Sequence, residues 1–212
     1  MKENEIQDEL TSIRSMMERS SKFISLSGLS GVLAGFYALI GAAVAWWIAF
    51  GADSFNHADY IQNNDIVNGP LYFNWQKLAL TGIIVFVASI ATGIYLTKRK
   101  AKQKGQSIWG RASRQLLFNL AVPLVTGAVL VLILIFRGYF SVIASTTLIF
   151  YGLALVNASN VTYNDVKYLG ILEIILGLLA AILPGFGLLF WAIGFGVLHI
   201  VYGTIMHLKY DR

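Results

Sequence analysis

The sequence predicts an all-α, polytopic integral membrane protein with six transmembrane helices, preceded by a short amphipathic helix. Hydrophobic residues make up 57% of the 212 residues and charged residues only 13%, whereas an ordinary soluble domain carries about 25% charge. The charges are also segregated, because residues 1–22 hold nine of them and residues 98–114 hold seven. So few charges would not cover a soluble fold of this size, which excludes a typical soluble enzyme and a disordered chain.

The length of the apolar runs gives the expected spans. A helix that crosses a bilayer needs about 20 mostly apolar residues, at about 1.5 Å each. The run that begins near residue 116 is too long for one crossing, so we expect the chain to turn at Arg137 and Gly138. Pro184 and Gly185 predict a tight hairpin between the last two spans. The expected spans are residues 23–50, 77–97, 116–136, 139–157, 166–183 and 186–208.

The orientation follows from lysine and arginine, which collect in cytoplasmic loops. With both termini in the cytoplasm, only Lys77 and Arg137 of the 16 basic residues lie outside. We therefore expect a multi-pass protein of a bacterial cell inner membrane, with the lipid bilayer as its first partner. Its expected parts are a cytoplasmic helix over 1–22, a membrane domain over 23–208 and a cytoplasmic tail over 209–212.

Residues 4–20 have the pattern of an amphipathic helix. Ile6, Leu10, Ile13 and Met17 recur at helical spacing and form one apolar face. The acidic start of this segment is unlike a membrane-surface helix, whose polar face is usually basic. We consider three alternatives: packing on the protein's own cytoplasmic face, docking to a protein partner or a second copy, and lying on lipid.

Two charged or polar segments outside the spans have simple interpretations. The basic residues 98–114 fix the cytoplasmic side and contact anionic headgroups. They lack the fold and the interleaved aromatic residues of a nucleic-acid site, so we expect no nucleic-acid partner. The outer loop, residues 51–76, contains Asp53, His57 and Asp59, but three ligands in a solvated loop are a weak pattern, and we expect no metal there.

Glu173 and His199 are the titratable side chains that stand well inside the expected spans. Measured from the hairpin at Pro184, they lie eleven and fifteen residues deep, or about 16 Å and 22 Å. This offset is about one helical turn, so we expect the two side chains to meet directly or through water. Haem is not expected, because His199 and His207 lie on one helix about 12 Å apart and would not face across one iron.

Asn119 and Tyr202 complete the candidate intramembrane polar site. Pro123 has no N–H to donate to the carbonyl of Asn119, so this carbonyl needs another polar partner. Tyr202 lies near the cytoplasmic end of the sixth span. The four candidate residues, Glu173, His199, Asn119 and Tyr202, form either a structural lock between helices or a proton or ligand site open to the cytoplasm.

Small residues recur on one face of the first span: Gly31, Gly35, Ala38 and Ala42. Such a face lets helices approach closely. It serves either packing within the chain or the formation of a homo-oligomer, and the sequence leaves both open.

The sequence contains no lipase-type, zinc-protease, P-loop or dinucleotide-binding motif. Because it also has no cysteine, thiol chemistry and iron–sulfur clusters are excluded. We therefore expect no enzyme, no catalytic residue and no cofactor. The first functional hypothesis is a non-catalytic membrane component that binds a partner or senses a membrane condition. The alternative is a small proton-linked transporter or channel that uses Glu173 and His199.

Overall fold

The computed structural model describes residues 27–51, 70–103, 109–183 and 185–210. Over these residues the chain is all-helical and has no strand, which confirms the predicted all-α class. Five helical stretches are long and apolar enough to cross a membrane: Gly28–Phe50, Asn74–Gln103, Arg111–Phe136, Phe140–Val161 and Gly187–Tyr210. A further long helix, Asp165–Ile182, has 18 residues but carries three charged side chains. The described residues thus contain five or six helices that could cross a membrane, which is consistent with a multi-pass membrane protein.

The helices follow the predicted spans closely. The first three are α2 (Gly28–Phe50), α4 (Pro70–Gln103) and α5 (Arg111–Phe136). A second group comprises η1 (Phe140–Val142), α6 (Ile143–Ala158), η2 (Ser159–Val161) and α7 (Asp165–Ile182). The last run is continuous and contains α8 (Gly187–Trp191), the π-helix η3 (Ala192–Leu198) and α9 (His199–Tyr210).

Two helices extend beyond the predicted spans. Helix α4 is longer than residues 77–97 at both ends, so that residues 70–76 are helix rather than outer loop. Proline fits this start because its fixed φ suits the first turn of a helix, where its missing N–H costs nothing. Helix α5 starts at Arg111 rather than at 116. The predicted turn between the third and fourth spans is present, with Gly138 at a φ of 79°, a conformation that favours glycine.

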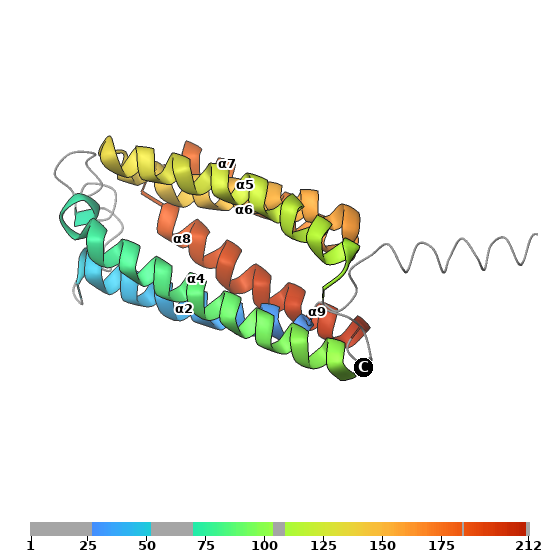
Figure 1. Ribbon diagram of the computed structural model, residues 1–212. Helices are drawn as coiled ribbons and strands as arrows, with labels where there is room; N and C mark the ends of the chain where they lie inside the picture. Colours follow the sequence, from blue (N-terminus) through green and yellow to red (C-terminus); the bar gives the residue numbers. More distant parts are fainter. Residues whose placement is uncertain (1–26, 52–69, 104–108, 184, 211–212) are drawn as a thin grey trace, which may run out of the picture.

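The helices form two layers, which Figure 1 shows one above the other. One layer contains α5, α6 and α7, with α6 packed against both of its neighbours. The other contains α2 and α4, which pack against each other. The last helical run crosses between them, because α8 packs against α6 and α7 whereas α9 packs against α2. The contact between the layers therefore depends largely on α8, η3 and α9.

Glycines let α2 and the last run approach closely. A Cβ on Gly203 would lie 2.5 Å from the backbone N of Val32, and one on Gly35 would lie 2.6 Å from the carbonyl O of Gly196. Gly31 faces Gly203 in the same contact. The chain's own η3 and α9 thus cover the small-residue face of α2, so this face is used for packing within the chain.

The two ends of the bundle differ in charge. Helices α5 and α7 begin, and α4 and α9 end, at the same end, which we call the Asp165 end; the opposite end is the hairpin end. Gly28, at the start of α2, also lies there, packed against the backbone of His207. Lys77 lies near the start of α4 and Arg137 directly follows α5, so both lie toward the hairpin end. The described basic residues at the helix ends that form the Asp165 end are Lys98, Arg99, Lys100, Lys102, Arg111, Arg114, Lys167 and Lys209. The predicted amphipathic helix, residues 4–20, lies outside the described residues.

Candidate functional site

Glu173 and His199 meet between the two layers. Glu173 projects from the middle of α7 and is 0% exposed, and His199, at the start of α9, is 7% exposed. The Nδ1 atom of His199 lies 3.4 Å from Oε1 of Glu173. The structure thus brings together the two residues that counting from the hairpin at Pro184 placed about one helical turn apart in depth.

Gly194, in the π-helix η3, makes room for the carboxyl group of Glu173. A Cβ added to Gly194 would lie 2.5 Å from Oε2 of Glu173 and 2.6 Å from the side chain of Leu148. Glycine at this position therefore lets the carboxyl group lie against the backbone of η3. Short π-helical turns inside α-helices are frequent at functional sites, and hydropathy alone does not reveal this one.

His199 has a hydrogen-bond partner at each ring nitrogen. Its Nδ1 lies 3.0 Å from the carbonyl O of Gly194, and its Nε2 lies 2.7 Å from the hydroxyl of Tyr151. A neutral imidazole satisfies both contacts when Nδ1–H donates to the carbonyl and Nε2 accepts from the tyrosine. In that tautomer the hydrogen on Nδ1 goes to the carbonyl of Gly194, and Glu173 receives none. The 3.4 Å contact is an ion pair only when the imidazole carries a second proton and is therefore positively charged.

Both carboxyl oxygens of Glu173 are buried and have no hydrogen-bond partner among the described residues. A buried charge without partners is costly in a membrane interior. The charge state of Glu173 therefore depends on the positions of the side chains around it.

Tyr151, which the sequence analysis missed, belongs to this group. It comes from α6, and its ring lies 4.9 Å from that of Phe195 and 5.4 Å from that of His199, centroid to centroid. A tyrosine in an apolar span resembles any other membrane aromatic residue, so its role emerges only from the packing of α6 against the last run. We call Glu173, His199 and Tyr151 the intramembrane triad.

Asn119 forms a different contact from the one expected. The side-chain amide of Asn157 donates to the carbonyl O of Asn119 at 2.9 Å, and that of Asn119 donates to the carbonyl O of Asn157 at 3.3 Å. The carbonyl that Pro123 leaves free thus has the polar partner it needs. This reciprocal pair links α5 to α6 and does not join Asn119 to the triad.

Tyr202 lies one turn beyond His199 on α9, toward the Asp165 end. Its hydroxyl is buried and has no hydrogen-bond partner among the described residues. It is close enough to interact electrostatically with Tyr151 on one side and with Asp165 on the other. Tyr202 thus lies between the triad and the end of the bundle.

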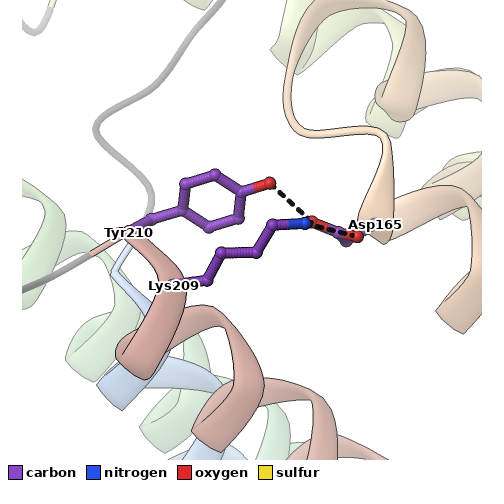
Figure 2. A network of polar contacts seen from close by, with 3 residues as sticks. All are labelled: Asp165, Lys209 and Tyr210. Carbon is purple, nitrogen blue, oxygen red and sulfur yellow. Dashed lines mark hydrogen bonds and ion pairs between the residues drawn. The ribbon is translucent and has the colours of Figure 1, made fainter.

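A second polar group, shown in Figure 2, joins the ends of α7 and α9. The Nζ atom of Lys209 lies 2.9 Å from Oδ2 of Asp165, and the hydroxyl of Tyr210 donates to the same oxygen at 2.7 Å. The ring of Tyr210 also stacks on Tyr163, with centroids 4.1 Å apart. We call Asp165, Lys209 and Tyr210 the Asp165 clasp.

The clasp changes the acidity of Asp165. The hydrogen bond from Tyr210, and then that from Lys209, hold the pKa of Asp165 below its ordinary value. Lys209 donates its hydrogen bonds to both carboxylate oxygens of Asp165, which pairs its positive charge with the negative one. Both groups therefore stay charged at neutral pH, and the clasp is formed there.

Among the described residues, no cluster of three or more histidine or acidic side chains is arranged to hold a metal ion. Asp53, His57 and Asp59 lie outside the described residues. Comparison with protein families, with characterised proteins and with solved structures finds no match for the chain. The fold and the triad define the class to which the protein belongs: an all-helical, multi-pass membrane protein with an ionisable group buried among its helices.

Proposed function

We propose that the protein is a non-catalytic, proton-sensing component of the membrane, in which Glu173 takes up and releases a proton. The observation that carries the proposal is the complete burial of Glu173 beside His199, with both carboxyl oxygens lacking a partner among the described residues. Ionisable residues inside membrane spans commonly mark proton or ion pathways.

The tight packing of the site favours a proton over a larger ligand. Even a methyl group on Gly194 would lie within 2.5 Å of the carboxyl oxygen. Two hollows in the surface of the described helices are lined by other residues, such as Trp47 and Lys77 in one and Pro123 and Lys167 in the other. A proton needs no cavity, whereas a solute would.

The location of the triad suggests how the proton is sensed. Glu173 and Tyr151 belong to the layer of α5, α6 and α7, whereas His199 belongs to the run that packs on α2. A proton gained or lost by Glu173 changes the attraction between the layers and shifts their relative position. A partner that binds through residues 4–20, or a second copy of the chain, would receive this change.

The proposed setting is a bacterial cell inner membrane, with the Asp165 end in the cytoplasm. The basic residues at that end support this orientation, because such residues collect on the cytoplasmic side.

The experiment uses the full chain in lipid vesicles and follows its carboxyl groups by infrared spectroscopy as the pH is varied. The wild-type protein should show a buried carboxyl band that appears and disappears with pH. Glu173→Gln should remove this band, and the control Lys167→Gln, at an exposed side chain outside the triad and the clasp, should retain it. A wild-type spectrum without any titrating band that depends on Glu173 would refute the proposal.

A proton-linked transporter or channel is the second candidate. It is favoured by the polar groups that continue from the triad through Tyr202 to Asp165. The same vesicles, loaded with a pH-sensitive dye, separate the two functions. A proton flux that Glu173→Gln abolishes indicates transport, whereas a titrating band without flux indicates sensing.

A further inference from the structure

Resting on the proposed function, we infer that Tyr202 passes protons between Glu173 and the Asp165 end, so that the triad exchanges protons with one side of the membrane. The route contains the buried hydroxyl of Tyr202, ordered water beside it and the Asp165 clasp. Four observations carry this inference.

The first observation is the condition of the Tyr202 hydroxyl. It is buried and, like both oxygens of Glu173, has no hydrogen-bond partner among the described residues. Buried polar atoms in proteins are almost always paired with protein groups or with ordered water. Water is therefore expected next to Tyr202 and next to Glu173, and hydrogen-bonded water of this kind can pass protons.

The second observation is the spacing along α9. His199, Tyr202, Met206 and Tyr210 follow one another at three or four residues and so share one face of the helix. Tyr210 lies eight residues beyond Tyr202, or about 12 Å. Because long side chains on a helix lean toward its N-terminus, the ring of Tyr210 leans back toward Tyr202. Polar side chains thus recur along this face from His199 to Tyr210, with the apolar Met206 between Tyr202 and Tyr210.

The third observation is the exposure of the clasp. The side chain of Lys209 is 53% exposed and that of Asp165 is 26% exposed. Asp165 is therefore in contact with solvent while it interacts electrostatically with Tyr202. This is the place where a proton enters or leaves the route.

The fourth observation is the apolar packing on the other side of the triad. Toward the hairpin end, Phe195 packs against Trp191 with centroids 5.0 Å apart and against His199 with centroids 5.9 Å apart. Among the elements that pack against α7, neither α8 nor η3 carries a titratable residue. Among the described residues, the titratable groups that interact with Glu173 are His199 on the last run and Tyr151 on α6, and Tyr202 lies one turn farther along α9. The polar route thus leads toward the Asp165 end.

The step at Tyr202 leaves charge and atoms balanced. The hydroxyl oxygen accepts a proton from water on one side and releases its own proton to water on the other side. Tyr202 is neutral before and after the step. The phenyl ring alone cannot do this, so Tyr202→Phe tests the route with little change in shape.

The experiment is a rapid pH jump on the full chain in vesicles, followed by the infrared band of Glu173. Tyr202→Phe should slow the change of this band at least about tenfold, as expected when one positioned proton carrier is removed, and should leave its equilibrium titration unchanged. The matched control is Tyr168→Phe, which removes the hydroxyl of a tyrosine on α7 that is 67% exposed and should leave the rate unchanged.

The outcomes separate this inference from the proposed function. If the Glu173 band titrates but Tyr202→Phe and Tyr168→Phe react at the wild-type rate, the Tyr202 route is wrong and proton sensing stands. If Glu173 does not titrate at all, the proposed function fails and the route fails with it. An unchanged endpoint in Tyr202→Phe also shows that the variant is folded.

Discussion

At the scale of single residues, the environment of the Glu173 carboxyl group is set by a few neighbouring residues. It is fully buried, lies against a glycine backbone and, in the part of the chain that the structure describes, has one polar side-chain contact, the 3.4 Å approach to His199. His199 is held in turn by Gly194 and Tyr151. A change at one member of this chain of contacts therefore affects the others.

The first prediction is a coupling between Glu173 and His199. Glu173→Gln and His199→Ala should each destabilise the protein, because each leaves a buried polar partner behind. The double variant should lose less than the sum, with a coupling energy of about 0.5–3 kcal/mol. The measurement is denaturant unfolding of the four proteins in mixed micelles.

A matched pair controls this cycle. Thr204 lies on α9 with its hydroxyl bonded to the carbonyl of Ile200 in its own helix, on an exposed surface. Thr204→Ala and Glu173→Gln should be additive. Additive effects of Glu173→Gln and His199→Ala would mean that the two residues do not interact.

At the scale of the helices, the features that depend on one helix or one turn could be predicted from the sequence. Hydropathy and length located each long helix, and Arg137 and Gly138 located a turn. Counting from the hairpin placed Glu173 near His199, because two helices joined by a short turn have a known register. The free carbonyl of Asn119 was also expected to find a polar partner, as it does in Asn157.

The features that depend on several helices were not predictable in this way. Tyr151 contacts His199 across 48 residues of sequence, and Lys209 contacts Asp165 across 44. Nothing in the local pattern of a span distinguishes a tyrosine that faces lipid from one that faces a histidine. The π-helix at Gly194 was missed because both it and an α-helix are compatible with the same apolar run.

The second prediction concerns the contact between α2 and α9. Gly203→Ala should destabilise the protein by about 1–3 kcal/mol, as overpacking usually does, because the new Cβ meets the backbone of α2 at Val32 and Gly28. Gly93→Ala on α4 is the control, since nothing lies within 4 Å of its new Cβ. Unfolding in mixed micelles measures both. Equal stabilities of the two variants would contradict the close approach of α2 and α9.

The third prediction concerns the pH dependence of the Asp165 clasp. The pKa of Asp165 is lower in the folded protein than in the unfolded chain, where it is about 3.9. Its contribution to stability is therefore fully present above that unfolded value and is lost as the pH falls through the lower folded value. Spin labels on Asn164 and Thr204 should move apart only in strong acid.

The same labels test the origin of this opening. Asp165→Asn should separate α7 and α9 already at neutral pH, because it removes the charge that holds Lys209. Lys167→Gln is the control, since that basic side chain is exposed and lies outside the clasp. An opening near neutral pH in the wild-type protein would show that another group controls it.

At the scale of the whole molecule, the charge differs between the two ends of the bundle, whereas the packing separates two layers that run along its length. The described basic residues gather at the Asp165 end, whereas the two layers run along the length of the bundle and meet at the triad. The clasp ties the layers together at the Asp165 end, and the hairpin joins α7 to α8 at the other. A shift at the triad would therefore act on layers that are tied together at both ends.

The last prediction is the orientation of the bundle. Because the start of α2 and the end of α9 lie at the same end as most of the described basic residues, reporters fused at Arg212 and inserted between Asp53 and Asn68 should lie on opposite sides of the membrane. The Arg212 fusion should report the cytoplasm, where basic residues collect. A third reporter inserted at Gly138 should match the one between Asp53 and Asn68, because that turn lies at the hairpin end. Like signals from Arg212 and Gly138 would mean that the number of crossings between them is even, and the six-span topology would be wrong.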